Sequence, residues 1–134
     1  MLMPKKTKYR KSHKGKRGGK ASRMNTISFG EFGLKSLEAC WVSSRQIEAT
    51  RRVLTRYIKK GGKIWIRVFP HKPVTGKSGE VPMGKGKGAV DHYVAVVKPG
   101  MVLFEMEGIP EKTAQDAIIS AGHKLPIKTK FITK

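Results

Sequence analysis

The positive charge of this chain is concentrated at its N-terminus, and this limits where a folded core can form. Residues 1–25 contain ten Lys and Arg and no Asp or Glu. Such a segment has little apolar surface to bury and does not offset the roughly 1–2 kcal/mol per residue that ordering a backbone costs. We therefore expect residues 1–25 to be a basic arm that orders on a polyanion, and residues 26–134 to form one globular domain. A solubilising tail is the alternative role for the arm.

The overall composition excludes several classes of protein. Among 134 residues, 29 Lys+Arg and 9 Asp+Glu give a net charge of +20, which points to a polyanionic partner. No run approaches the ~20 apolar residues that span a bilayer, and the N-terminus lacks the apolar core of a signal peptide. Cys40 is the single cysteine, which fits a reducing, cytoplasmic compartment and excludes a disulfide framework. We expect no membrane partner, no small-molecule substrate and no cofactor.

Alternating apolar residues predict the strands of a two-layer α+β domain with a mainly antiparallel or mixed sheet. Strands are expected over residues 29–37 (one or two short ones), 63–69, 91–98, 101–107 and 125–132. Pro99-Gly100 is a turn signal, which indicates a hairpin between the third and fourth of these segments.

Two helices are expected between these strands. The first is opened by Ser43 and Gln46, which match the S-x-x-Q capping box, and we expect it to end at Gly61-Gly62. The second begins at Pro110, carries small apolar residues at i, i+3, i+4 and i+7 spacing, and ends at Gly122.

The first of these helices carries a stripe of cations opposite its apolar stripe. On a helical wheel Ile47, Leu54 and Ile58 share one side, and the opposite side gathers Arg45, Arg52, Arg56 and Lys59. Solvated helix faces usually mix charges at i,i+4 spacing, because each opposite-charge pair stabilises the helix by about 0.2–0.5 kcal/mol. Here Glu48 is the only acidic residue among several cations. We interpret the stripe as a phosphate-binding face, with an ordinary solvated face as the alternative.

A connection of twenty residues, 70–89, is rich in Gly and Lys and longer than ordinary connections. Residues 79–85 fit the P-loop pattern G-x-x-x-x-G-K, but Gly86 stands where the Mg²⁺-binding Ser or Thr belongs. Residues 84–89 fit G-x-G-x-x-A, but they lead into a strand instead of a helix. We therefore reject a nucleotide site and interpret the segment as a protruding loop whose backbone and lysines contact nucleic acid. A flexible linker is the alternative.

Residues suited to catalysis or to metal binding form no recognisable motif. The four histidines are widely spaced and match no metal-ligand pattern. Glu105 and Glu107 share a strand face, where we expect them to pair with lysines. Trp41 and Trp65 have the chemistry to stack on bases, but each adjoins an apolar run, so we expect burial in or beside the core. The sequence predicts a protein that is not an enzyme and has no metal site.

Four motifs resemble the bacterial family of large-subunit ribosomal protein sixteen. They are MLMPKKTKYRK at the start, WVSSRQIEATRRVLTRYIKKGGKIWIRVFPHKPVT in the middle, MGKGKG in the loop and KLPIKTKFI near the end. The resemblance implies an α+β fold of the α/β-hammerhead type and a structural role in the large ribosomal subunit. It further implies binding to large-subunit ribosomal RNA beside the A site, placement of A-site tRNA, help in subunit assembly, and contact with neighbouring ribosomal proteins, in a bacterium or an organelle.

The resemblance also assigns functional residues, motif by motif. The arm cations that match the family's N-terminal rRNA-contacting run are Lys5, Lys6, Lys8, Arg10 and Lys11. The helix cations that match its S-R-Q-I-E-A segment are Arg45, Arg51, Arg52 and Arg56. Charge and position add, as further rRNA-binding candidates, Lys14, Lys16, Arg17, Arg23 and Lys59. The loop matching the segment near the tRNA and the peptidyl-transferase region is Pro82, Met83, Gly84, Lys85, Gly86, Lys87 and Gly88.

One departure from the family concerns Pro82. Many members carry an arginine immediately before the loop methionine, hydroxylated in some of them, so no guanidinium contact or modification is carried over to this position.

An architectural DNA-binding protein is the alternative class, because it would use the same cations. Such a protein presents a helix or ribbon to the major groove, or apolar wedges to the minor groove. A basic arm and a long Gly/Lys loop suit an irregular, folded RNA better.

Overall fold

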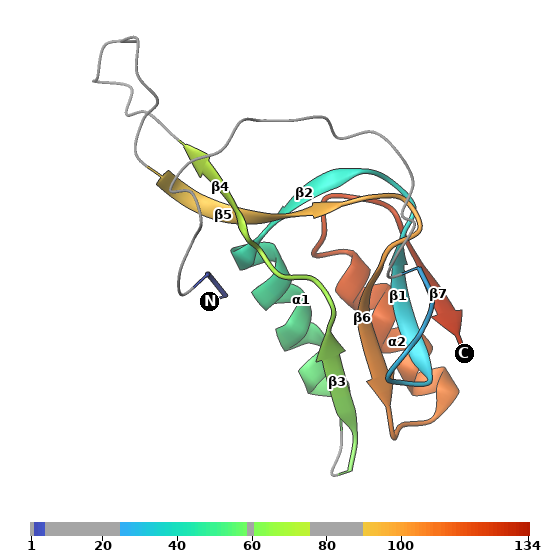
Figure 1. Ribbon diagram of the computed structural model, residues 1–134. Coiled ribbons are helices and arrows are strands. Elements are labelled where there is room, and N and C mark those ends of the chain that lie inside the picture. The colour runs from blue at the N-terminus through green and yellow to red at the C-terminus, as the bar shows by residue number, and fades with distance from the viewer. Residues whose placement is uncertain (1, 5–24, 59–60, 76–89) are drawn as a thin grey trace, which may run out of the picture.

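The computed structural model describes residues 2–4, 25–58, 61–75 and 90–134, and these form two antiparallel sheets and two helices (Figure 1). The predicted α+β class is confirmed. In chain order the elements are β1 (Phe32–Ser36), β2 (Cys40–Ser43), α1 (Ser44–Tyr57), β3 (Lys63–Ile66), β4 (Lys72–Thr75), β5 (Val90–Val97), β6 (Val102–Glu107), α2 (Glu111–Gly122) and β7 (Thr129–Thr133).

Several predicted site residues lie outside the described residues. They are the arm cations Lys5, Lys6, Lys8, Arg10, Lys11, Lys14, Lys16, Arg17 and Arg23, the helix-end Lys59, and loop residues 82–88. Of the arm, residues 2–4 and 25 are described. Leu2 packs against the hydrophobic core, and residues 26–30 lie on the domain after the arm.

A four-stranded sheet, called here the main sheet, has the order β3-β6-β1-β7, and both helices lie on one side of it (Figure 1). The alternation of β6 explains this layering, because Phe104 and Met106 are fully buried in the core that the helices cover. From α2, the residues Ala114, Ala117 and Ile118 face the same core, as their spacing predicted. Small side chains there let the helix approach the sheet closely.

A second sheet of three strands, the small sheet, has the order β2-β5-β4, and it corrects one prediction. Pro99-Gly100 does form a tight turn, in which Met101 N–H donates to the Lys98 carbonyl (3.2 Å) and Gly100 takes a φ of +91°. The hairpin expected there is wrong, however. β5 pairs with β2 and β4, whereas β6 pairs with β1 and β3, so the turn passes the chain from one sheet to the other.

The small sheet also shortens the expected loop. Residues 72–75, which the sequence placed in the loop, form strand β4 and pair with β5 in the register Pro73↔Tyr93. A proline is tolerated there because β4 is an edge strand. Strands β3 and β7 agree with the predicted segments, but each is shorter than expected: β3 ends at Ile66 and β7 begins at Thr129.

Helix α1 begins as predicted and ends earlier than predicted. Gln46 N–H donates to Ser43 Oγ (3.2 Å) and Ser43 N–H donates to Gln46 Oε1 (2.9 Å), which completes the capping box. The end expected at Gly61-Gly62 is wrong, because the helix stops at Tyr57 and Ile58 is already extended, with a φ of −84° and a ψ of 128°. No helix in the described ranges has both the length and the apolar character to cross a membrane.

Candidate nucleic-acid interface

The exposed face of α1 brings three of the predicted arginines together. Arg45, Arg52 and Arg56 are all exposed, and the buried side of the same helix presents Ile47 and Leu54 to the core. At a rise of ~1.5 Å per residue, the arginines span about 16 Å along the helix axis. We call Arg45, Arg52 and Arg56 the cationic face.

One acidic residue on α1 organises its neighbours. Glu48 accepts a hydrogen bond from Arg51 Nε at 3.0 Å and lies 3.5 Å from Arg52 Nε. The hydrogen bond from Arg51 lowers the pKa of Glu48, and the same bond raises the pKa of Arg51. Arg51 is therefore engaged within the helix, and among the described residues neither Arg45 nor Arg56 has an acidic partner.

The N-terminal end of α1 adds to this positive potential. The first turn contains no acidic residue, and it contains Arg45. The positive end of the helix dipole would be stabilised by a carboxylate, at roughly 0.3–1 kcal/mol for an exposed site. Instead, a cation stands beside it, so this end of the helix is attractive to an external anion such as a phosphate.

A second polar cluster lies on the side of the main sheet that the helices leave open. Residues 26–30, called here the strap, cross this side of the sheet. Ile27 of the strap and Ile132 of β7 both lie next to Gly33 of β1. The close contact depends on the glycine, since a Cβ on Gly33 would lie 3.2 Å from Ile27 Cγ1. The strap is thus seated directly on β1 and β7.

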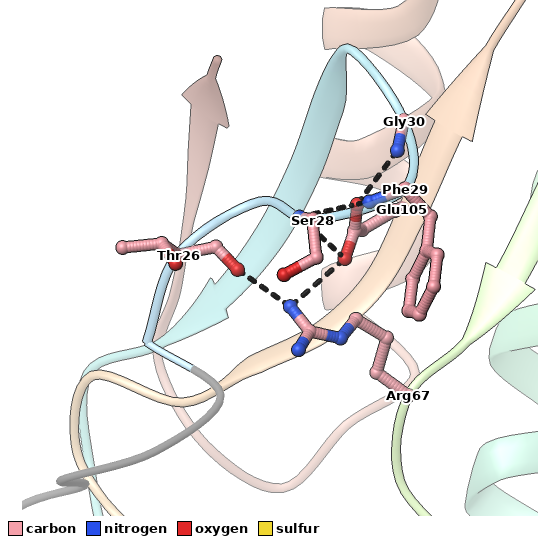
Figure 2. A network of polar contacts seen from close by, with 6 residues as sticks. All are labelled: Thr26, Ser28, Phe29, Gly30, Arg67 and Glu105. Carbon is pink, nitrogen blue, oxygen red and sulfur yellow. Dashed lines mark hydrogen bonds and ion pairs between the residues drawn. The ribbon is translucent and has the colours of Figure 1, made fainter.

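Glu105 holds the strap from below (Figure 2). Its carboxylate is fully buried and accepts the backbone N–H groups of Ser28 (3.1 Å), Phe29 (2.8 Å) and Gly30 (2.8 Å). Arg67 Nη1 lies 2.9 Å from Glu105 Oε2 and also donates to the carbonyl of Thr26. One buried ion pair therefore fixes every residue of the strap except Ile27, which is held by packing.

The expectation that Glu105 pairs with lysines is wrong, and the pKa explains what it does instead. Burial by itself raises the pKa of Glu105, but the bonds from Gly30, Phe29 and Ser28 and the charge of Arg67 outweigh it, so the pKa lies below its ordinary value. The side chain is therefore ionised at neutral pH and neutralises Arg67. A glutamate in the middle of the apolar strand segment 101–107 was the signal available in the sequence.

The expected burial of the two tryptophans in or beside the core is met only in part, because neither belongs to the described core or to the side chains packed against it. Both are half-buried. Trp65 stacks with Phe29, with ring centroids 6.2 Å apart, and the Lys72 ammonium lies 4.7 Å from the centroid of Trp41. Within the described part of the chain, no group of His, Cys, Asp and Glu side chains is arranged to hold a metal ion.

Comparison with known proteins identifies the family. The model of the family described as ribosomal protein L16p/L10e matches residues 4–132. The large ribosomal subunit protein uL16c of Gracilaria tenuistipitata is 60% identical over 134 residues, which cover 100% of this chain and 99% of the relative. The uL16c proteins of Porphyra purpurea (60% identical, 100% and 96% covered) and Trieres chinensis (58%, 100% and 98%) are similar over the same length. The chain therefore belongs to the ribosomal protein L16p/L10e family and is a structural, non-enzymatic constituent of the large ribosomal subunit.

Proposed function

We propose that this protein binds large-subunit ribosomal RNA through the cationic face of α1 and the basic arm, and that this binding contributes to subunit assembly. The observation that supports it most directly is the set of three exposed arginines on one side of one helix, two of them without an acidic partner among the described residues. A face that only solvated the helix would gain by mixing charges at i,i+4 spacing.

We further propose that the Gly/Lys loop helps to place A-site tRNA. Residues 76–89 are flanked by β4 and β5, and β5 enters the small sheet at Val90 and leaves it at Val97 toward the turn into the main sheet. The loop is therefore attached at the end of β5 that is farther from the main sheet. Support for tRNA as the partner comes from the loop motif MGKGKG. Subunits reconstituted without the protein should bind less A-site tRNA than complete subunits do.

The relatives favour an organellar ribosome over a bacterial one. The similar proteins from Gracilaria tenuistipitata, Porphyra purpurea and Trieres chinensis are uL16c, the chloroplast type, and come from algae. We propose that this chain also works in a plastid ribosome, next to other ribosomal proteins. Co-sedimentation with the large subunit of isolated plastid ribosomes tests this directly.

The test of RNA binding is the variant Arg52→Gln/Arg56→Gln in the full chain. Glutamine removes the charge without creating the like-charge i,i+4 pairs that glutamates would form, one between positions 48 and 52 and one between positions 52 and 56. Affinity for large-subunit rRNA should fall, and the slope of log K against log salt should become shallower by about 0.7–0.9 per lost phosphate contact. Filter binding across a salt series measures both quantities.

The matched control is Lys112→Gln/Lys124→Gln. Both lysines are exposed, and the double substitution changes the net charge equally, but Lys112 lies on α2 and Lys124 just beyond its end. It should leave the salt slope close to that of the unaltered chain. Equal losses in the two double variants would show that only total charge matters, and an unaltered slope in the arginine variant would refute the role of the cationic face.

A further inference from the structure

Phe29 is a large apolar residue held in an exposed place. Its side chain is 57% exposed, although its backbone N–H is bonded to the buried carboxylate of Glu105 at 2.8 Å. The N–H groups of Ser28 and Gly30 bind the same carboxylate, so the backbone on both sides of the ring is fixed as well. Figure 2 shows the Phe29 side chain extending from the strap away from the Glu105 carboxylate.

The ring is braced by two neighbours. Trp65 stacks with it at an interplanar angle of 21°, and the guanidinium carbon of Arg67 lies 5.6 Å from its centroid. The strap approaches Trp65 closely because residue 30 is glycine, where a Cβ would lie 2.6 Å from the Met106 carbonyl oxygen and 3.1 Å from the Trp65 ring. Phe29 therefore has a defined position, which an exposed ring on a free loop would lack.

The electrostatics around the ring suit a partner that is both planar and attached to a polyanion. Arg67 and the three N–H groups neutralise Glu105, so the carboxylate beneath Phe29 presents no net charge to a ligand. The chain as a whole carries +20. Aromatic rings and arginine planes are the surfaces on which proteins stack splayed-out bases of single-stranded RNA.

We propose that Phe29, braced by Trp65 and Arg67, is a stacking platform for one unpaired nucleobase of the ribosomal RNA. The inference rests on the proposed function, since it requires the RNA to reach this side of the main sheet. An apolar side chain of a neighbouring ribosomal protein is the competing occupant. Charge complementarity favours the RNA base, because the chain's net charge of +20 attracts phosphates.

The experiment compares Phe29→Leu and Phe29→Trp in the full chain. Leucine keeps an apolar side chain and removes the ring, whereas tryptophan keeps a stacking surface. Phe29→Leu should weaken rRNA binding about tenfold, the order expected for one lost base–aromatic stack, and Phe29→Trp should stay within about threefold of the unaltered chain. Because no phosphate contact changes, the salt slope should be the same in all three proteins.

A photo-crosslinking residue at position 29 identifies the occupant in reconstituted subunits. A crosslink to an RNA base supports the platform, and a crosslink to a neighbouring protein overturns it. Equal rRNA affinity of Phe29→Leu and the unaltered chain overturns it as well, while salt-dependent rRNA binding through α1 would still stand. If instead the Arg52→Gln/Arg56→Gln variant bound rRNA as tightly as the unaltered chain, the proposed function of the cationic face would be refuted.

Discussion

Replacing Glu105 by glutamine should remove a large part of the stability of this domain. Glutamine has nearly the same shape, but it leaves the Arg67 side chain, which is only 11% exposed, without a charged partner. Its amide NH₂ must also face either Arg67 or the strap N–H groups, all of which are donors. Breaking a buried ion pair by removing one partner costs about 3–5 kcal/mol, and we expect Glu105→Gln to lower the free energy of unfolding by about that amount.

The expected loss is large relative to the total free energy of unfolding of a small domain. Small domains have a free energy of unfolding of about 5–15 kcal/mol, so Glu105→Gln should remove a substantial fraction of it. Urea unfolding followed by tryptophan fluorescence measures it by linear extrapolation. The control is Glu107→Gln, two residues farther along β6 and only half-buried, which should change the free energy of unfolding by less than about 1 kcal/mol.

The pH dependence of the free energy of unfolding tests whether the ionised carboxylate of Glu105 is responsible for this loss. The folded pKa of Glu105 lies below its unfolded value of about 4.3, so the stability it contributes is present above that unfolded pKa and is lost as pH falls through the folded pKa. The difference in unfolding free energy between the unaltered chain and Glu105→Gln should therefore be full near pH 7 and should shrink in acid below about pH 4. A difference that is small, or equal at pH 7 and pH 3, would refute the role assigned to the buried carboxylate.

Two further substitutions test the local structure. Ser43→Ala removes the bond that Ser43 Oγ accepts from Gln46 N–H and should lower the free energy of unfolding by about 1 kcal/mol, measured by urea unfolding. No change would mean that the Gln46 side chain alone suffices as a cap. Gly108→Ala places a Cβ 2.7 Å from the Gly61 carbonyl oxygen at a residue with a φ of +84°, and it should cost about 1–3 kcal/mol in the same assay. Gly61→Ala, also at positive φ but with open space around the added Cβ, should cost less.

Local signals in the sequence predicted the elements that local physics determines. The cap at Ser43 uses side chains three residues apart, and the buried side of α2 follows from the spacing of its alanines. The cationic face was predicted for the same reason, because helical periodicity places Arg45, Arg52 and Arg56 on one side whatever the rest of the chain does.

The features that depend on distant partners were not predicted. Pro99-Gly100 indicates a turn, but which strands pair on either side of it is decided by β2 and β4. Proline is rare within strands, so Pro73 argues against a strand at this position. β4 forms because it pairs with β5 at the edge of the small sheet. The strap depends on Glu105, 75 residues or more from the backbone groups it binds, and no spacing in the sequence encodes that contact.

Three of the nine acidic residues of this chain make contacts that support the fold. Glu105 holds the strap, Glu48 holds Arg51, and Glu38 accepts the backbone N–H of Lys128 at 2.8 Å. A net charge of +20 destabilises a compact chain by self-repulsion, so an acid such as Glu105 or Glu38 is useful where two distant segments meet. Folding and RNA binding then depend on different charges, and neutralising Arg52 and Arg56 should weaken rRNA binding while leaving the free energy of unfolding nearly unchanged.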